Sequence, residues 1–272
     1  MTSLSNANKV MRNVNYYLRM AHYALLYSLI AFLFFSINTA FAADKFSFAV
    51  FGDNQDGDKV FIDLIDRLNN GASLAFAVNN GDLTPYGREA EYKKYLAMTN
   101  KLSVKLYNVP GNHDLVAGGG KYYLKYIGPY YHSMDYANSH FIFLNNAFKD
   151  SFDKVQFNWL KEDLENNKKE HVFVFMHRPT FDPTEIYAGY IMSGRRTVEE
   201  VMALFKRNKV DYVFAGHIHG YAKAEREGTV YIVTGGAGAP LHLPRDIGGF
   251  NHYVKITVDG DKIQEKVVKI YE

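Results

Sequence analysis

The sequence predicts a globular α/β fold behind an apolar leader, and three observations carry this prediction. The chain has 272 residues, 47% of them hydrophobic and 22% charged, which is enough to bury one sizeable core. Short β-prone apolar runs alternate with longer amphipathic segments, as in α/β proteins. Several of the apolar runs end in polar clusters, which places the chemistry at the carboxyl ends of strands.

Residues 1–42 have the pattern of a secretory signal peptide. Basic residues precede an apolar run over residues 24–37, and Ala40-Phe-Ala42 fits a small-x-small cleavage site before Ala43. A membrane span needs about 20 apolar residues, which residues 20–43 just supply if the leader stays uncut. The sequence therefore predicts export to the periplasm or extracellular space, with an amino-terminal membrane anchor as the alternative.

Beyond the leader the chain is almost neutral. The leader holds three of the 31 basic residues and none of the 29 acidic ones, which leaves 28 basic and 29 acidic side chains in residues 43–272. This balance argues against a general polyanion-binding surface, so no nucleic-acid patch is expected. The chain has no cysteine, which excludes disulfides, thiolate ligands and a cysteine nucleophile.

The first half of residues 43–272 is interpreted as three strand and helix units. Strands are expected at residues 45–51, 73–78 and 104–109, and helices at residues 58–68 and 88–100, with Asp58 as the first N-cap. Asp53 follows the first strand, Asp82 the second, and Asn112 with His113 the third. Because neighbouring parallel strands end at one edge of a sheet, these four side chains are expected together.

The second half continues the pattern. Further strands are expected at residues 140–144, 171–176, 211–215, 229–233, 252–258 and 262–270, and further helices at residues 152–165 and 195–208. The strand before His177 delivers that residue at its carboxyl end, whereas His132 and His140 are interpreted as structural. Residues 118–120 are expected as a flexible loop. The glycine-rich turn at 234–240 lacks the Gly-Lys-Ser/Thr ending of a nucleotide P-loop.

Two histidines separated by one residue follow the strand at 211–215. In an extended chain residues i and i+2 face the same side, so His217 and His219 would share one site if the extended geometry continued past Gly216. Neutral imidazoles suit a metal centre. Taken alone, such a pair is more often two polar histidines in a turn, and only the other motifs favour the metal.

The motifs follow the order Gly-Asp, Gly-Asp, Gly-Asn-His-Asp, a histidine after a strand, and Gly-His-x-His. This order closely resembles the calcineurin-like metallophosphoesterase superfamily over the stretch from Asp53 to His219. A single Gly-Asp is weak evidence, but Pro-Gly-Asn-His-Asp and Gly-His-Ile-His are each fairly specific. The resemblance implies one α/β domain over residues 43–272, built as a four-layer β-sandwich flanked by helices (αββα), with its metal site at strand carboxyl ends.

The resemblance also implies a pair of divalent or trivalent metal ions. Asp82 would bridge them. One ion would be completed by Asn112, His177 and His217, and the other held by Asp53 and His219. Carboxylate, amide oxygen and imidazole together suit manganese, iron or zinc better than softer ions.

The same resemblance assigns the remaining candidate residues. His113 would contact the phosphoryl group or protonate the leaving oxygen, and Asp114 would orient His113. Arg178 and His242 are candidate phosphate or substrate contacts by their placement, each with the alternative of a surface or loop residue. Gln55 departs from the superfamily, which usually has histidine at this position. As a weaker, neutral ligand it would leave the site of Asp53 to bind its ion loosely, to take extra water or to prefer a harder ion.

Three hypotheses follow. The first is an exported metal-dependent phosphoesterase that hydrolyses phosphomonoesters or phosphodiesters, with a small-molecule or nucleotide-type phosphate ester as substrate. The second is a phosphate- or metal-binding protein of the same fold with weak or no turnover, favoured by Gln55. The third is a membrane-tethered surface protein that uses the sandwich as a scaffold, which requires the leader to remain.

Overall fold

The structure, a computed structural model, describes residues 22, 45–71, 73–148 and 151–271. The predicted signal peptide and its cleavage site before Ala43 therefore lie outside the described residues. The compact unit of the chain spans Asp44–Glu272. None of the helices in the described part of the chain has the length and apolar character needed to cross a bilayer.

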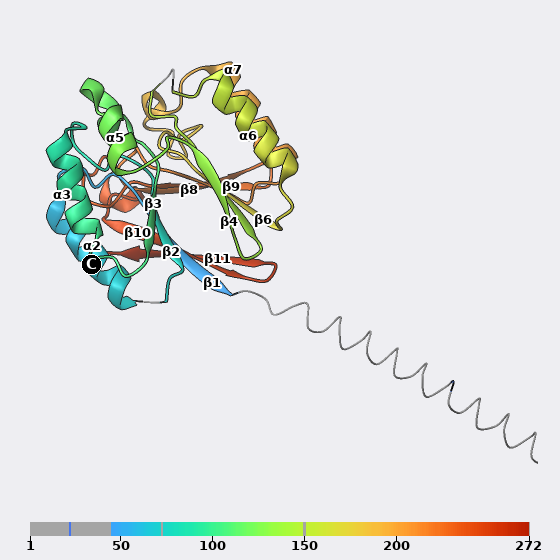
Figure 1. The fold of residues 1–272 in the computed structure, drawn as a ribbon, viewed down its shortest axis with the longest axis horizontal. Coiled ribbons are helices and arrows are strands. Elements are labelled where there is room, and N and C mark those ends of the chain that lie inside the picture. The colour runs from blue at the N-terminus through green and yellow to red at the C-terminus, as the bar shows by residue number, and fades with distance from the viewer. Residues whose placement is uncertain (1–21, 23–44, 72, 149–150, 272) are drawn as a thin grey trace, which may run out of the picture. The chain divides into compact units, whose positions relative to one another are not determined.

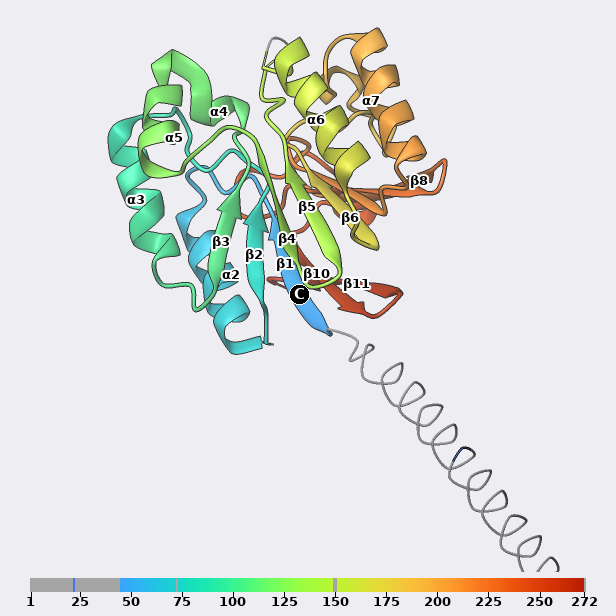
Figure 2. The same ribbon diagram turned by 45° about the vertical axis from the view of Figure 1, so that its right-hand side comes forward.

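Two mixed β-sheets form the centre of this unit (Figure 1, Figure 2). The first sheet has the order β11-β10-β1-β2-β3 and comprises β1 (Phe46–Phe51), β2 (Phe76–Asn79), β3 (Lys105–Asn108), β10 (His252–Asp259) and β11 (Lys262–Lys269). The second has the order β4-β5-β6-β7-β9-β8 and comprises β4 (His132–Tyr136), β5 (Ser139–Phe143), β6 (His171–Phe175), β7 (Tyr212–Ala215), β8 (Tyr221–Arg226) and β9 (Thr229–Thr234). In the first sheet β1, β2 and β3 run parallel, as do β5, β6, β7 and β9 in the second.

Helices cover the outer face of each sheet, which confirms the predicted α/β sandwich (Figure 1). The first sheet packs against α2 (Asp58–Gly71), α3 (Glu89–Thr99) and α5 (Gly120–Tyr126). The second packs against α6 (Lys154–Asn166) and α7 (Arg195–Arg207). A short helix, α4 (Asn112–Leu115), lies directly beyond β3 (Figure 2).

Phenylalanine side chains fill the space between the two sheets. Phe48 of β1 lies edge-on against Phe141 of β5 and Phe173 of β6, with ring centroids 5.4 and 5.1 Å apart. The neighbouring Ala49 points the other way, into the core beneath the helices. Both faces of β1 are thus buried, which explains why its sequence is an apolar run rather than a simple alternation.

The starts of two helices differ from the sequence prediction. The sequence predicts a flexible loop at residues 118–120, but Gly120 begins α5, because Tyr123 is buried edge-on against Tyr92 of α3. Tertiary packing here overrides a weak helix propensity. Asp58 is the first helical residue rather than the cap; Phe61 donates its N–H to the Gly57 carbonyl, and the Asp58 carboxylate pairs with Lys94.

Two strands were not predicted, and both lie at edges of the second sheet. β8 mixes alanine with Lys223, Glu225 and Arg226, and its mostly solvated side chains leave no hydrophobic periodicity to read. β4 likewise begins at a half-buried His132 and ends in exposed residues. Edge strands need only one paired neighbour, so their sequences are less constrained than those of central strands.

Candidate metal centre

The predicted polar clusters meet where the two sheets end. Asp53 follows β1, Asp82 follows β2, and Asn112 with His113 begin α4 beyond β3. The second sheet supplies the rest, with His177 following β6 and both His217 and His219 following β7. Ligands from the first sheet thus face ligands from the second.

Their ligand atoms form two groups that share one carboxylate. Asp82, His177 and His217 make the first, and Asp53, Asp82 and His219 the second; within each, the ligand atoms lie within 4.8 Å of one another. His177 Nε2 lies 3.4 Å from Asp82 Oδ1, and His219 Nε2 lies 3.5 Å from Asp53 Oδ1. The two histidines of the Gly-His-x-His motif therefore belong to different groups.

Backbone carbonyls decide which nitrogen of each imidazole faces the centre. His177 donates from Nδ1 to the Asn80 carbonyl at 2.9 Å, and His219 donates from Nδ1 to the Pro240 carbonyl at 2.7 Å. Each Nε2 is then left with a free lone pair that faces a carboxylate. A metal-binding histidine characteristically donates its other ring N–H in this way.

Several acceptor atoms crowd together around His177 Nε2. Asn112 Oδ1 and His217 Nδ1 both lie 3.1 Å from it. Unprotonated nitrogen and oxygen atoms this close repel one another unless a proton or a cation lies between them. The donor set of carboxylate, amide oxygen and imidazole, so arranged, fits ions such as manganese, iron and zinc.

The ionisation of these groups is strongly coupled. Burial lowers the pKa of His217 to about 2, helped by the positive charges of His177 and Arg178, so His217 is a neutral imidazole. Burial also disfavours charge on His177, but the Asp82 carboxylate outweighs it and raises the pKa of His177 to about 9. Burial likewise opposes the charge of Asp82, yet His177 holds its pKa well below the usual range. In the absence of metal, a proton on His177 offsets the carboxylate.

Three of the gathered ligands have left-handed backbone conformations. The φ angles are 62° at Asp53, 55° at Asp82 and 66° at His217. Non-glycine residues rarely adopt this region, and such strain clusters at functional sites. The extended geometry therefore ends at Ala215, so the condition under which strand alternation would aim His217 and His219 to one side is not met, although both line one hollow. The turn at His217 sends the two imidazoles to separate groups.

Two motif glycines allow the carboxylates to approach the backbone. A Cβ atom at Gly111 would lie 2.1 Å from Asp82 Oδ1, and one at Gly216 would lie 2.4 Å from Asp53 Oδ2. His217 N–H also donates to both oxygens of Asp53, at 3.1 and 3.0 Å. The glycines of Gly-Asn-His-Asp and Gly-His-x-His therefore make room for carboxylates supplied by other strands.

Gln55 contacts the shared carboxylate. Its Nε2 donates to Asp82 Oδ2 at 3.1 Å, and its backbone N–H donates to the Asp82 carbonyl at 3.0 Å. In this orientation Gln55 is a hydrogen-bond partner of Asp82. Service as an oxygen ligand, as predicted from the sequence, requires the amide to turn over.

His113 and Asp114 are not paired as predicted. The His113 ring bonds the Pro85 carbonyl through Nδ1 at 2.7 Å. The backbone N–H of His113 donates to Asp82 Oδ1 at 2.9 Å. The buried Asp114 instead accepts from Thr84 N–H at 2.9 Å and from Gly111 N–H at 2.8 Å. The prediction that Asp114 orients His113 is therefore wrong, because each side chain is already bonded to a different group of the loop after β2.

Asp114 has a supporting position instead. Burial, together with the nearby charge of Asp82, raises the pKa of Asp114 to about 7. Its oxygens tie the loop after β2 to the loop after β3 through Thr84 and Gly111. Asp114 thus fixes the backbone that carries Asp82 and Asn112.

These residues surround a hollow of about 330 Å³, which we name the central hollow. It is lined by Gln55, Asp82, His113, Tyr190, His217, His219, Pro240 and His242. The His242 ring stacks on the His219 ring at 3.9 Å and 14°. Arg178 is not one of the lining residues, because its Nε donates to the Ala147 carbonyl at 2.8 Å.

Tyr190 is the lining residue that sequence reasoning missed. Its ring lies 5.3 Å from that of His217 and 5.3 Å from that of His242. It belongs to an irregular segment between β6 and α7 whose sequence has no periodicity or motif. Its place within residues 181–196, a stretch that follows the candidate ligand His177, is the one signal that could have drawn attention to it.

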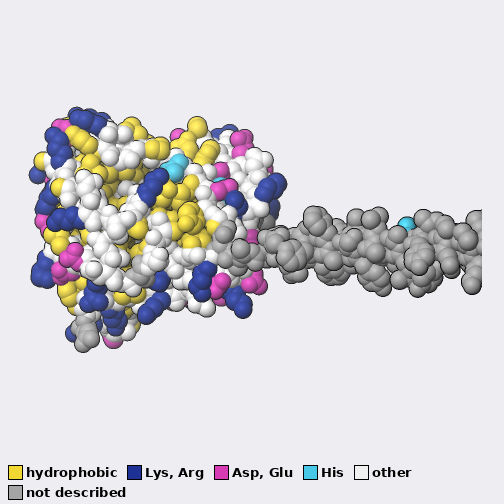
Figure 3. All heavy atoms as spheres, turned by 60° about the horizontal axis from the view of Figure 1, so that its bottom comes forward, with side chains coloured by type: hydrophobic (Ala, Val, Ile, Leu, Met, Phe, Trp, Pro, Cys, Tyr) yellow, Lys and Arg dark blue, Asp and Glu magenta, His cyan; other side chains and the backbone are white. Residues whose placement is uncertain are grey.

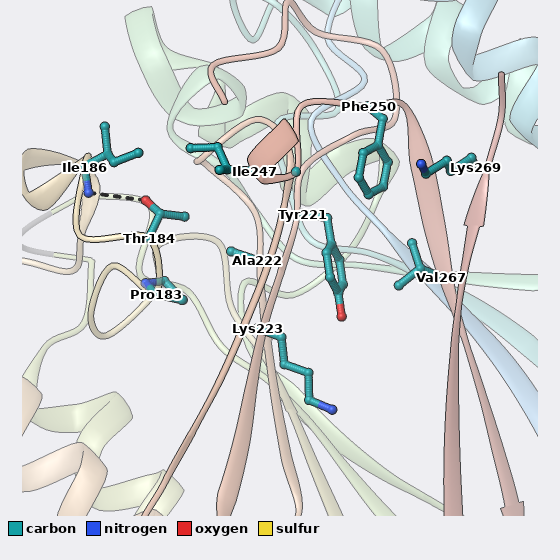
Figure 4. Close-up of a pocket in the computed structure, with 11 residues that line it drawn as sticks. Pro183, Thr184, Ile186, Tyr221, Ala222, Lys223, Ile247, Phe250, Val267 and Lys269 are labelled. Atoms are coloured by element: carbon teal, nitrogen blue, oxygen red, sulfur yellow. Dashed lines mark hydrogen bonds between the residues drawn. The ribbon is translucent and has the colours of Figure 1, made fainter. Parts of the chain in front are cut away.

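A larger hollow, of about 730 Å³, lies away from this chemistry between β8 and β11 (Figure 4). Tyr221 and Phe250 point into it, and Lys269 lies over the Phe250 ring at 4.4 Å. Lys223 at its edge is paired with Glu265 at 2.5 Å. None of its lining residues is a predicted site residue, so its size does not make it the functional site.

The surface carries no single dominant charge on the face shown in Figure 3. Hydrophobic side chains gather near its centre, and Lys and Arg lie among Asp and Glu around the margins. Most described ion pairs are exposed, for example Lys45 with Asp259 and Lys59 with Asp63. Exposed pairs of this kind contribute little to stability.

Known proteins share this sequence pattern and this fold. The family model for calcineurin-like phosphoesterases matches residues 46–221. Purple acid phosphatase 22 of Arabidopsis thaliana is 30% identical over 122 residues, which cover 44% of this chain and 27% of that protein. The chain thus corresponds to only about a quarter of the length of that relative.

Solved structures extend the similarity to most of the chain. A purple acid phosphatase from yellow lupin seeds superimposes with a TM-score of 0.69 at 15% identity, covering 84% of this chain and 52% of that one. A dimetal phosphatase from Danio rerio superimposes with a TM-score of 0.65 at 16% identity, covering 84% of this chain and 97% of that one. At these identities the likeness concerns the fold alone.

Proposed function

The chain belongs to the calcineurin-like phosphoesterase family, and we propose that it is an exported, metal-dependent phosphoesterase that hydrolyses phosphomonoesters or phosphodiesters. The observation that carries the proposal is the pair of ligand groups sharing Asp82. In each group one imidazole donates its Nδ1–H to a backbone carbonyl, which leaves Nε2 for a ligand.

The proposed ligands divide between two ions, with manganese, iron and zinc as the candidates. Asp82, Asn112, His177 and His217 would hold one, and Asp53, Asp82 and His219 the other. When bound, such a pair supplies an activated water and neutralises charge on the phosphoryl oxygens. Gln55 would adjust the second site through its hydrogen bond to Asp82 rather than replace the missing histidine.

The remaining residues bind the ester and move the proton. The Pro85 carbonyl keeps His113 protonated at Nδ1, so Nε2 is the atom that gains a proton and gives it to the leaving oxygen. His242 accepts the His219 N–H at Nδ1, which leaves its own proton on Nε2 as a donor for a phosphoryl oxygen. Asp114 holds the loops that position these groups.

Hydrolysis of p-nitrophenyl phosphate and of its bis ester by purified protein, with added manganese, tests the proposal. Asp82→Asn should lower the rate at least about a hundredfold and reduce bound metal, because both sites share this carboxylate. Asp56→Asn is the matched control, since Asp56 is exposed and lies outside both groups. Activity that survives both a chelator and Asp82→Asn contradicts the proposal.

A second candidate function rests on Gln55, whose amide donates to Asp82 instead of offering an oxygen to the ion beside Asp53. A protein that binds phosphate or a single metal without turnover is compatible with this contact. Metal analysis separates the two candidates. Fewer than one tightly bound ion per chain, with no hydrolysis across a panel of esters, supports the binding protein.

Export depends on the leader, which residues 1–42 supply in sequence only. Amino-terminal sequencing of the exported protein tests it. Ala43 as the first residue supports a cleaved signal peptide. An intact leader supports a membrane anchor, and with it the tethered scaffold.

A further inference from the structure

Tyr190 has no part in the metal or proton chemistry proposed above, yet it lines the same central hollow as Asp82 and His113. It ends a single 3₁₀ turn, Ala188–Tyr190, and it is the largest of the residues that line the hollow. The residue is 38% exposed. No hydrogen bond of its hydroxyl group occurs among the contacts of the described residues. Its ring is therefore an open aromatic face beside the ligands.

The segment that carries Tyr190 is held at several points. Asp182 accepts the N–H groups of Thr184 and Tyr187, and Tyr190 N–H donates to the Tyr187 carbonyl at 2.8 Å. The Tyr187 ring lies edge-on to that of Tyr190, with centroids 5.4 Å apart, and its hydroxyl donates to the His242 carbonyl at 2.7 Å. The aromatic face is thus preorganised against the site, and a ligand need not order it.

The central hollow has two chemically different sides. The carboxylates and imidazoles on one side suit a phosphoryl group. On the other, Tyr190 and Pro240 line the hollow. Leu241, which is 37% exposed, lies in sequence between the lining residues Pro240 and His242. A volume of about 330 Å³ accommodates a phosphoryl group with one ring attached.

We propose that Tyr190 selects the leaving group, and that the site prefers aryl phosphate esters, whose single planar ring stacks on the tyrosine ring. This inference rests on the proposed function, because the phosphoryl group must occupy the metal side for the ring to reach Tyr190. Stacking of two aromatic rings adds about 2- to 12-fold to an affinity, in excess of what the buried area contributes. Tyr190 acts on binding of the aryl group and leaves the metals in place.

The test uses two non-hydrolysable probes that differ only in the group on phosphorus, phenylphosphonate and methylphosphonate. Their affinities for the full-length, metal-loaded protein are measured by calorimetry, with metal content determined for every variant. The unmodified protein should bind phenylphosphonate about 2- to 12-fold more tightly than methylphosphonate. Tyr190→Phe should keep this preference. Tyr190→Ala and Tyr190→Leu should lose most of it, the leucine variant retaining bulk without an aromatic face.

Tyr271→Ala is the matched control, because Tyr271 is similarly exposed, at 42%, but lies at the carboxyl terminus beside Asp63. The control should bind both probes as the unmodified protein does. A preference for phenylphosphonate that survives Tyr190→Leu overturns the proposal. So does an equal loss of both probes, or a loss of metal, in Tyr190→Ala, since either places Tyr190 in support of His217.

Hydrolysis separates this inference from the proposed function. If phenylphosphonate is preferred through Tyr190 but no ester is cleaved, aryl recognition stands and the phosphoesterase proposal fails. If esters are cleaved, Tyr190→Leu should raise the KM of phenyl phosphate several-fold while the KM of glycerol phosphate stays within twofold. If neither phosphonate binds the unmodified protein, the inference is wrong whatever the hydrolysis shows.

Discussion

At the scale of single residues, the centre is organised by backbone carbonyls rather than by neighbouring acids. His113, His177 and His219 each direct Nδ1 to a carbonyl, those of Pro85, Asn80 and Pro240. A carbonyl cannot take the proton that an imidazole loses, so it fixes the tautomer over a wide pH range. Each Nε2 is therefore the ring nitrogen that remains to contact a ligand.

The two histidines of the Gly-His-x-His motif should differ in what their loss costs. His219→Ala is expected to lower the metal content from about two ions to about one per chain, because the second group keeps only Asp53 and the shared Asp82. His217→Ala leaves Asp82, His177 and Asn112 around the first ion and should weaken it without emptying the second. Metal analysis after dialysis measures both. If both variants lose the same amount of metal, the assignment of His217 and His219 to different ions is wrong.

His140, away from the centre, should make stability depend on pH. It shares hydrogen bonds with Asp135 at 2.6 Å and Asp163 at 2.8 Å. Burial disfavours the imidazolium, but the two carboxylates outweigh it and raise the pKa above the usual 6.5. The folded protein thus holds this proton more tightly than the unfolded chain does. The contribution is complete below about pH 6.5 and is lost as pH rises through the raised pKa.

His140→Gln is accordingly expected to lower the free energy of unfolding by about 1–3 kcal/mol at pH 6, because it removes hydrogen bonds to charged groups. The difference from the unmodified protein should shrink at pH 8.5. Urea unfolding at the two pH values measures it. A difference that does not change with pH shows that His140 acts by packing alone.

At the scale of elements, the site is made by the turns that end strands. β1, β2 and β7 each pass into a residue with positive φ, namely Asp53, Asp82 and His217. Asp53 N–H donates to the Gly81 carbonyl at 2.9 Å, which joins the first two turns. Hydrogen bonds between turns therefore maintain a strained backbone that no single turn would keep.

The close approach of the Asp53 carboxylate to Gly216 can be tested by substitution. Gly216→Ala would place a methyl group 2.4 Å from Asp53 Oδ2, so the carboxylate must move and metal affinity on that side should fall by about 10- to 100-fold. Gly189→Ala is the control, because nothing lies within 4 Å of a Cβ atom there. Metal affinity is measured by competition with a chelator. Unchanged affinity in Gly216→Ala shows that Asp53 is not a ligand.

At the scale of the whole molecule, the centre lies between two sheets that are otherwise joined by an apolar core. Phe48, Phe141 and Phe173 pack across that core, and the carboxylates of the first sheet face imidazoles of the second at its end. The two carboxylates, Asp53 and Asp82, repel each other, and a metal ion would neutralise them more fully than the proton on His177 does. Bound metal should therefore stabilise the fold as well as serve the chemistry.

Chelation should lower the melting temperature. Metal present at about a hundred times its Kd stabilises a protein by about 2.7 kcal/mol, which for a domain of this size corresponds to about 5–10 °C. Differential scanning calorimetry with and without EDTA measures the shift, and Asp82→Asn should show almost none. An equal shift in Asp82→Asn shows that the metal binds elsewhere.

The sequence by itself determined where the strands end and which polar residues follow them. These signals are local, since burial of a strand requires an apolar run and a tight turn requires glycine beside the ligand. The strands bearing Asp53, Asp82, His177 and His217 could be predicted for that reason. The weakly patterned edge strand β8 and the tyrosine-rich α5 could not, because their stability comes from neighbours.

Tertiary structure alone decided the partners of the site residues. Asp114 was predicted beside His113 from adjacency in sequence, but the turn of α4 sends it to Thr84, and a carbonyl takes its place. Tyr190 reaches the hollow because Tyr187 is bound to His242, 55 residues further along the chain. Hydrogen bonds between distant loops depend on how two sheets pack, and no local pattern encodes that packing.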